Sequence, residues 1–159
     1  MNIFIKSAAI LTVLLGSGLT QAANNTASIP MGVEVPKSCS FSNVSAGIVL
    51  PEDGSEAQGS FNHTCNIDGG FNVTYSLDSR SIGSPKVKNI DGISLPITAR
   101  IKSECCDLSL DNGSQTINFY YSFLSRPVLG VVTAKLITPT TATTPAGVYT
   151  DTFRVNVNY

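Results

Sequence analysis

Few residues in this sequence could do chemistry. There is a single histidine, His63, and no glycine-rich phosphate loop. An enzyme site needs a nucleophile with a base, a pair of positioned carboxylates or a metal cluster. His63 lies in an alternating segment beside a cysteine, which favours a structural or surface role. The acidic residues in the same regions are interpreted as solvated charge: Glu52, Asp53, Glu56, Glu104 and Asp107. We therefore predict no enzyme activity, no cofactor and no metal site.

The four cysteines allow three disulfide pairings, because Cys39, Cys65, Cys105 and Cys106 can join in three ways. Two pairings need the adjacent Cys105 and Cys106 to reach Cys39 and Cys65 together, although neighbours on a strand point to opposite faces. We favour Cys39–Cys65, which closes a loop of about 25 residues and stabilises by about 3 kcal/mol. Cys105 and Cys106 are then free, bonded to each other in a strained ring, or bonded to another molecule.

The first 22 residues have the pattern of a secretory signal peptide. Lys6 precedes an apolar run from about Ala8 to Leu19, and small residues precede the expected cleavage after Ala22. Cleavage leaves 137 residues, enough for one domain, and the cysteines would then meet an oxidising compartment. Nine basic and eleven acidic residues remain, with no basic patch, so we expect no nucleic-acid partner.

The elements that would position these residues are short strands. At the end of the chain Phe153, Val155, Val157 and Tyr159 share one face, and polar residues share the other. This alternation predicts a strand with one buried face. A second alternating segment occupies residues 27–35, where Pro30 lacks the N–H that a ladder would use. Its apolar residues are Ala27, Ile29, Met31, Val33 and Val35.

Between these two segments the sequence predicts at least five more strands. Turn signals occur at Asp68-Gly69-Gly70, Asp91-Gly92 and Asn112-Gly113. The first of these predicts a hairpin between the segments 57–67 and 71–78. No segment has a helical period over ten residues. The chain is therefore predicted to be all-β, an Ig-like β-sandwich.

The two ends of the chain permit two architectures. Residues 27–35 could fold back as an ordinary first strand of their own sheet. Alternatively, they could leave the domain and complete the sheet of a neighbouring subunit, which is donor-strand complementation. The groove would then lie open beside residues 151–159. Because donor and groove belong to one molecule, repeated contacts of this kind would build filaments.

The ordered set of segments resembles the spore coat U/Csu-type pilin family, subunits of bacterial chaperone–usher pili. The similarity lies in "GVYTDTFRVNVNY" at the end, "GSFNHTCNIDGGFNVTYSL" around the second cysteine, "VVTAKLITP", and the alternating segment before Cys39. The stretch from about Ser79 to Ser125 matches poorly, and Cys105-Cys106 lies outside the family pattern.

The resemblance implies an incomplete Ig-like sandwich with a Cys39–Cys65 disulfide, completed by a donor strand from a neighbouring subunit. A periplasmic chaperone would fill the groove first, and an outer-membrane usher would exchange it for the next pilin subunit. It implies residues 1–22 as signal peptide, 23–37 as donor segment and 38–159 as pilin domain. Ala27, Ile29, Met31, Val33 and Val35 would be the donor residues, and Phe153, Val155, Val157 and Tyr159 the acceptor strand.

The expected function is therefore a structural subunit of a surface pilus, or fimbria, that serves adhesion and biofilm formation at the bacterial cell surface. One domain with a donor segment indicates a shaft or minor subunit rather than a tip adhesin, which would need about twice this length. The alternatives are a secreted coat protein of the same fold and a monomeric secreted Ig-like binding module.

Overall fold

The computed structural model describes residues 28–79, 84–120 and 126–159, so the predicted signal peptide and Ala27 lie outside the described residues. The described chain falls into two units, residues 28–34 and residues 35–159. Residues 28–34 form no strand. Residues 35–159 hold all nine strands of the described chain, and the described residues include no α-helix. No helix in this part of the chain is long and apolar enough to cross a membrane.

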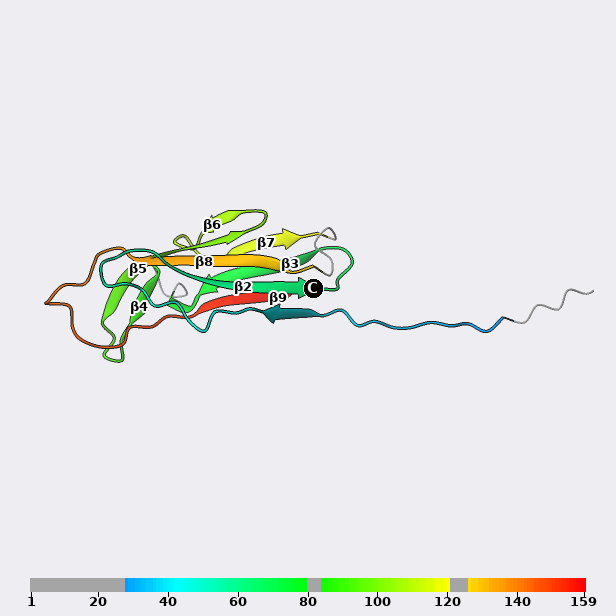
Figure 1. Ribbon diagram of the computed structural model, residues 1–159, viewed down its shortest axis with the longest axis horizontal. Helices are drawn as coiled ribbons and strands as arrows, with labels where there is room; N and C mark the ends of the chain where they lie inside the picture. The colour runs from blue at the N-terminus through cyan, green and yellow to red at the C-terminus, as the bar shows by residue number, and fades with distance from the viewer. Residues whose placement is uncertain (1–27, 80–83, 121–125) are drawn as a thin grey trace, which may run out of the picture. The chain divides into compact units, whose positions relative to one another are not determined.

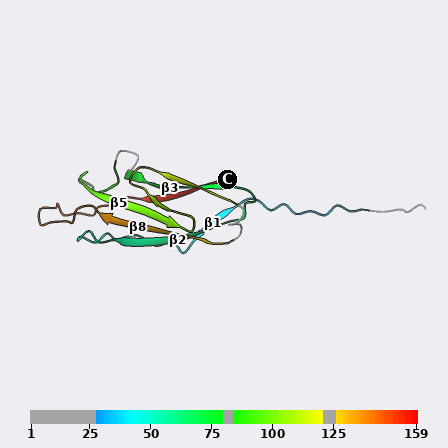
Figure 2. The same cartoon turned by 90° about the horizontal axis from the view of Figure 1, so that it is seen from above.

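Two antiparallel sheets make up the domain (Figure 1). The larger has the order β1-β2-β8-β5-β4, with β6 also paired to β5, and the smaller has the order β7-β3-β9. Figure 2 shows the two sheets as separate layers. The strands are β1 (Cys39–Ser42), β2 (Ala57–Cys65), β3 (Phe71–Leu77), β4 (Lys86–Lys88), β5 (Ser94–Ser103), β6 (Asp107–Ser109), β7 (Gln115–Phe119), β8 (Val128–Leu136) and β9 (Phe153–Asn158).

The core forms between the sheets because the strands alternate apolar and polar residues. Along β3 the side chains of Phe71, Val73, Tyr75 and Leu77 are buried, while those between them are more exposed. The inner face of β2, β5 and β8 supplies the opposite wall. At its centre the ring of Phe61 lies against Gly130, where any Cβ atom would overlap it. This all-β, two-sheet architecture confirms the predicted fold class.

One sequence prediction about connectivity is wrong. Residues 57–67 and 71–78 do not form a hairpin, because β2 pairs with β1 and β8 whereas β3 pairs with β7 and β9. The turn at Asp68-Gly69-Gly70 instead carries the chain from one sheet to the other, as in a sandwich. Gly69 has a φ of 99°, a backbone conformation that glycine adopts readily and other residues rarely do. The turn at Asp91-Gly92 does join a hairpin, that of β4 and β5.

Candidate strand-acceptor groove beside β9

β9 is an edge strand whose unpaired backbone groups belong to its apolar residues. It pairs with β3 in the register Leu77↔Phe153 to Asn72↔Asn158. The N–H of Asp78 donates to the carbonyl of Thr152 at 3.0 Å, so this pair is hydrogen-bonded. Because bonded and non-bonded pairs alternate along an antiparallel ladder, the bonded residues of β9 are the even-numbered ones. The N–H and C=O groups of Phe153, Val155 and Val157 therefore point away from β3, toward the open edge.

The apolar face of β9 is incompletely covered. Phe153, Val155 and Val157 pack on the core, yet each is only half-buried. On the neighbouring β3, Val73 and Tyr75 are 0% exposed. The ring of Phe153 stacks on Tyr75 at a centroid distance of 6.3 Å and lies 6.1 Å from Phe61. Among the described strands, β9 therefore has β3 on one side and no neighbour on the other.

A cavity of about 1060 Å³ opens between the sheets near the start of β9, where Phe153 lines it. One wall is the segment 44–50, which follows β1, and another is the segment 144–153, which leads into β9. Its floor consists of core residues from both sheets. These include Phe61, Leu77, Ala99, Val132, Ala134 and Leu136. We call this cavity, together with the free edge of β9, the acceptor groove.

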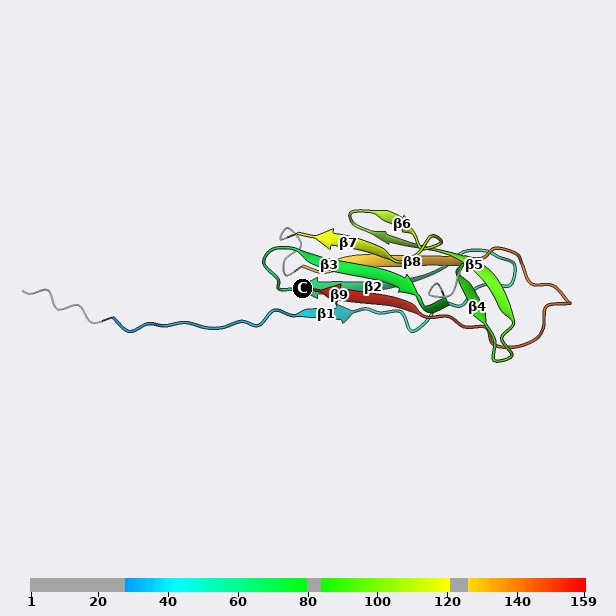
Figure 3. The same cartoon turned by 180° about the vertical axis from the view of Figure 1, so that it is seen from behind.

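The groove is open because the two sheets both end on this side. β1 and β9 lie on the same side of the sandwich when it is seen from the front and from behind (Figures 1 and 3). β1 is the outer strand of the larger sheet, and β9 is the outer strand of the smaller one. No pairing joins β1 to β9 among the described strands. An apolar interior is therefore reachable between two strand edges.

The segment 44–50 follows β1 after an irregularity in the pairing of β1 with β2. Asn43 has a φ of 51°, and the ladder slips by one residue: Ser42 is opposite Asn62, but the N–H of Ser45 donates to the carbonyl of Ser60 at 2.8 Å. Ile48 and Leu50 then pack on the core. Gly59 makes room for Ile48, since a Cβ atom there would lie 2.7 Å from its Cγ1. Sequence reasoning missed this wall, although the alternation of Ile48 and Leu50 with exposed Val49 signals it.

Residues of the terminal motif fix the start of β9. The Asp151 carboxylate accepts hydrogen bonds from the Ser79 backbone N–H at 2.9 Å and from its hydroxyl at 2.6 Å. The Ser79 hydroxyl in turn accepts from the N–H of Lys86 at 3.1 Å. The hydroxyl of Tyr149 donates to the carbonyl of Pro145 at 2.8 Å. These bonds hold the loop before β9 against the β3–β4 connection.

Residues 28–35 present apolar side chains to solvent. Ile29, Met31 and Val33 are 84%, 94% and 88% exposed, and Val35 is 68% exposed. Exposure of four large apolar side chains at alternate positions is unusual for a segment without a partner. The structure places Tyr159 just beyond β9 and 60% exposed. Thus Phe153, Val155 and Val157 line the groove edge, while Tyr159 stands outside the core.

Both cysteine pairs are disulfides. Cys39 at the start of β1 is bonded to Cys65 at the end of β2, directly opposite in the ladder. Cys105 is bonded to Cys106 in the tight turn between β5 and β6, where Ser103 N–H donates to the Cys106 carbonyl at 2.8 Å. The Cys39–Cys65 disulfide fixes β1 to β2, and the segment 44–50 follows directly after β1.

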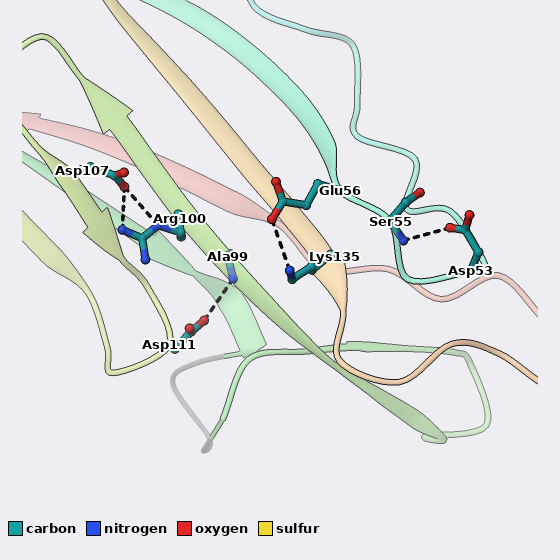
Figure 4. Close-up of polar contacts among 8 residues, drawn as sticks. All are labelled: Asp53, Ser55, Glu56, Ala99, Arg100, Asp107, Asp111 and Lys135. Atoms are coloured by element: carbon teal, nitrogen blue, oxygen red, sulfur yellow. Dashed lines mark hydrogen bonds and ion pairs between the residues drawn. The ribbon is translucent and has the colours of Figure 1, made fainter.

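The side chains that were considered for catalysis are either buried in the aromatic core or engaged in contacts that maintain the fold. His63 is 1% exposed among Phe61, Phe71 and Phe119, and burial lowers its pKa. Several acidic residues make polar contacts with neighbouring side chains or backbone, as Figure 4 shows for Asp53, Glu56, Asp107 and Asp111. Glu56 pairs with Lys135 at 3.2 Å, and Asp107 with Arg100 at 3.0 Å. Across the described ranges, His, Cys, Asp and Glu form no group of three that could hold a metal ion.

Comparisons with known proteins give structural likenesses only. No model of a known protein family and no curated protein sequence matches this chain. One similar solved structure is described as a chaperone–tip adhesin complex of CFA/I fimbriae biogenesis. It is 19% identical with a TM-score of 0.45, and the match covers 76% of this chain and 42% of that chain.

A second similar structure is the CsuC–CsuE chaperone–tip adhesion subunit pre-assembly complex from archaic chaperone–usher Csu pili of Acinetobacter baumannii. It is 16% identical with a TM-score of 0.48, and the match covers 79% of this chain and 40% of that chain. The chain thus spans about two fifths of the length of these two solved chains.

Proposed function

We propose that this protein is a structural subunit of a surface pilus, polymerised by donor-strand exchange. The observation that carries the proposal is the acceptor groove. Its edge strand β9 turns the backbone groups of Phe153, Val155 and Val157 outward, beside an apolar cavity of about 1060 Å³. An incoming strand with apolar residues at alternate positions would satisfy the backbone groups and fill the cavity together.

Residues 27–35 of a second copy have the properties that such a strand needs. Their apolar side chains recur with period two, and those from Ile29 to Val35 are exposed in the single chain. Full burial of one large apolar side chain contributes about 1.5–3 kcal/mol. Four such side chains and a row of backbone hydrogen bonds would make a long-lived joint between subunits.

The proposed assembly route follows from the same groove. An unfilled groove exposes apolar surface and strand edges, which favour aggregation during export. A periplasmic chaperone would cover the groove, and an outer-membrane usher would then replace it with the donor segment of the next pilin subunit. Residues 1–22 would direct export, residues 23–37 would donate, and residues 38–159 would accept. The resulting fimbria would serve adhesion and biofilm formation at the cell surface.

The test compares two aspartate substitutions in the mature chain. Met31→Asp places a charge on the donor face that would be buried in the joint, whereas Gly32→Asp places the same charge on the opposite face. We expect wild type and Gly32→Asp to form multimers by size-exclusion chromatography, and Met31→Asp to remain a single subunit. A synthetic peptide covering residues 24–37, added at about 100 times its Kd, should raise the melting temperature of Met31→Asp by about 10 °C.

Other outcomes would identify the alternatives. A wild-type chain that stays monomeric, and a Met31→Asp chain that ignores the peptide, would indicate a secreted Ig-like binding module. Multimers that produce no thin filaments in electron micrographs of the cell surface would indicate a coat protein of the same fold.

A further inference from the structure

We infer that Pro30 determines how the donor strand can enter the groove: it permits pairing antiparallel to β9 and opposes both parallel pairing and a shift by one residue. This inference rests on the proposed function. It concerns the one donor position whose backbone cannot donate a hydrogen bond. The proline lies in the middle of the alternating segment, between Ile29 and Met31, where a ladder would ordinarily be harmed.

In an antiparallel arrangement, the N–H that Pro30 lacks would have pointed away from β9, so its absence costs no hydrogen bond to β9. The open edge of β9 offers the N–H and C=O groups of Phe153, Val155 and Val157, whose side chains face the core. Residues directly opposite one another in an antiparallel pair share a face, and a pair exchanges both hydrogen bonds when its backbone groups point toward the partner strand. The donor residues bonded to β9 are therefore those that face the core, such as Ile29 and Met31. Pro30 faces outward, and its nitrogen points away from β9.

In a parallel arrangement the same proline would interrupt the ladder. In a parallel pair, a residue whose N–H and C=O point toward the partner strand bonds to the two residues that flank the one opposite it. The core-facing residues of β9 would then bond to the outward-facing residues of the donor, which are Ser28, Pro30, Gly32 and Glu34. One carbonyl of β9 would remain without a donor in a buried joint, which weakens binding by about tenfold.

A shift by one residue is opposed in the same way. It would turn Pro30 and Glu34 toward the core and expose Met31 and Val33, so that the proline nitrogen again met β9. The proline also restrains Ile29 to the extended conformation that a donor strand needs. A residue that looks unfavourable in the sequence therefore specifies one orientation and one face.

The experiment uses the mature Met31→Asp chain, which keeps the groove, and four synthetic peptides covering residues 24–37. The first has the natural sequence. The second carries Pro30→Ala, which restores an N–H at the outward position. The third and fourth carry an N-methyl group on Met31 or Val33, which removes a core-facing N–H and keeps the side chain. Each Kd is measured by isothermal titration, and each complex is also refolded from urea with peptide present so that a weakly folded chain gives a reading.

The inference predicts that Pro30→Ala changes the Kd less than threefold, while N-methylation of Met31 or Val33 weakens binding by tenfold or more. It is overturned if Pro30→Ala tightens binding by tenfold and the N-methylated peptides bind like the natural one. That pattern would leave the donor-strand proposal standing with the other orientation. If the natural peptide neither binds nor stabilises, the donor-strand proposal itself fails, and the inference fails with it.

Discussion

At the scale of single residues, the core contains polar groups that have no ordinary partner. Among the described residues, the two ring nitrogens of His63 are buried without a hydrogen bond, and the hydroxyls of Tyr75 and Ser103 are buried as well. Burial raises the pKa of Tyr75 to about 12, and the Ser103 side chain opposes that rise. Burial lowers the pKa of His63 from its ordinary 6.5, while the charge of Glu104 acts in the opposite direction. His63 is therefore held neutral by the aromatic core.

This arrangement predicts that mild acid destabilises the domain through His63. Below pH 6.5 the histidine of the unfolded chain takes up a proton that the folded chain refuses, so unfolding becomes more favourable as pH falls. The free energy of unfolding should fall by up to about 1.4 kcal/mol per pH unit between pH 6.5 and the lowered pKa. Urea denaturation at pH 7.5, 6.5 and 5.5 measures this slope.

His63→Phe is the matched control, because it keeps an aromatic ring among Phe61, Phe71 and Phe119 and cannot titrate. Its stability should be nearly constant over the same range. Equal slopes in the two proteins would show that His63 does not cause the acid sensitivity.

At the scale of elements, β9 depends on contacts made outside its own ladder. Asp151 stands just before the strand and holds Ser79 through both carboxylate oxygens. Ser79 also accepts from Lys86, at the start of β4. One side chain therefore connects the approach to β9, the end of β3 and the β4 strand. The terminal motif therefore both lines the cavity and positions the edge strand.

Replacing Asp151 by alanine should destabilise the domain by about 1.5–3 kcal/mol, because hydrogen bonds to a charged, partly buried carboxylate are lost. Asp53→Ala is the control, since Asp53 also accepts from a serine N–H, at 2.9 Å, but in an exposed turn. It should cost less than about 1 kcal/mol. Thermal denaturation of both variants tests the difference, and equal losses would refute a special role for Asp151.

The sequence predicted the elements better than their partners. The alternation in 153–159 is a local pattern, so the sequence alone identifies β9 and the face that it turns toward the core. The sequence of 57–78 contains the same local signals for two strands and a glycine turn, but nothing local distinguishes a hairpin from a crossing between sheets. The wall at 44–50 carries a local signal in the alternation of Ile48, Val49 and Leu50, but that signal does not say that the segment borders a cavity.

At the scale of the whole molecule, a disulfide constrains the strand beside the groove. Cys39 and Cys65 are 26 residues apart and join β1 to β2, whereas Cys105 and Cys106 are neighbours. A crosslink stabilises mainly by restricting the unfolded chain, and the restriction grows with the loop that it closes. The first disulfide closes a long loop, and the second closes almost none.

The two disulfides should therefore contribute unequally. Replacing Cys39 and Cys65 together by serine is expected to lower the free energy of unfolding by about 3 kcal/mol. Replacing Cys105 and Cys106 together should change it by less than about 1 kcal/mol. Urea denaturation under non-reducing conditions measures both, and a larger loss in the second double variant would contradict the loop-entropy explanation.

In the proposed assembly, donor and acceptor segments on one chain would make the joint head-to-tail, so each added copy would extend a filament without closing a ring. The measurement that tests this account most directly is amide hydrogen exchange by NMR on ¹⁵N-labelled Met31→Asp, with and without the peptide covering residues 24–37. Without peptide, the amides of Arg154, Asn156 and Asn158 should be protected by β3, while those of Phe153, Val155 and Val157 exchange rapidly. With saturating peptide all six should be protected. Protection of Phe153, Val155 and Val157 in the single chain, or their continued rapid exchange with peptide present, would contradict an open groove that a donor strand completes.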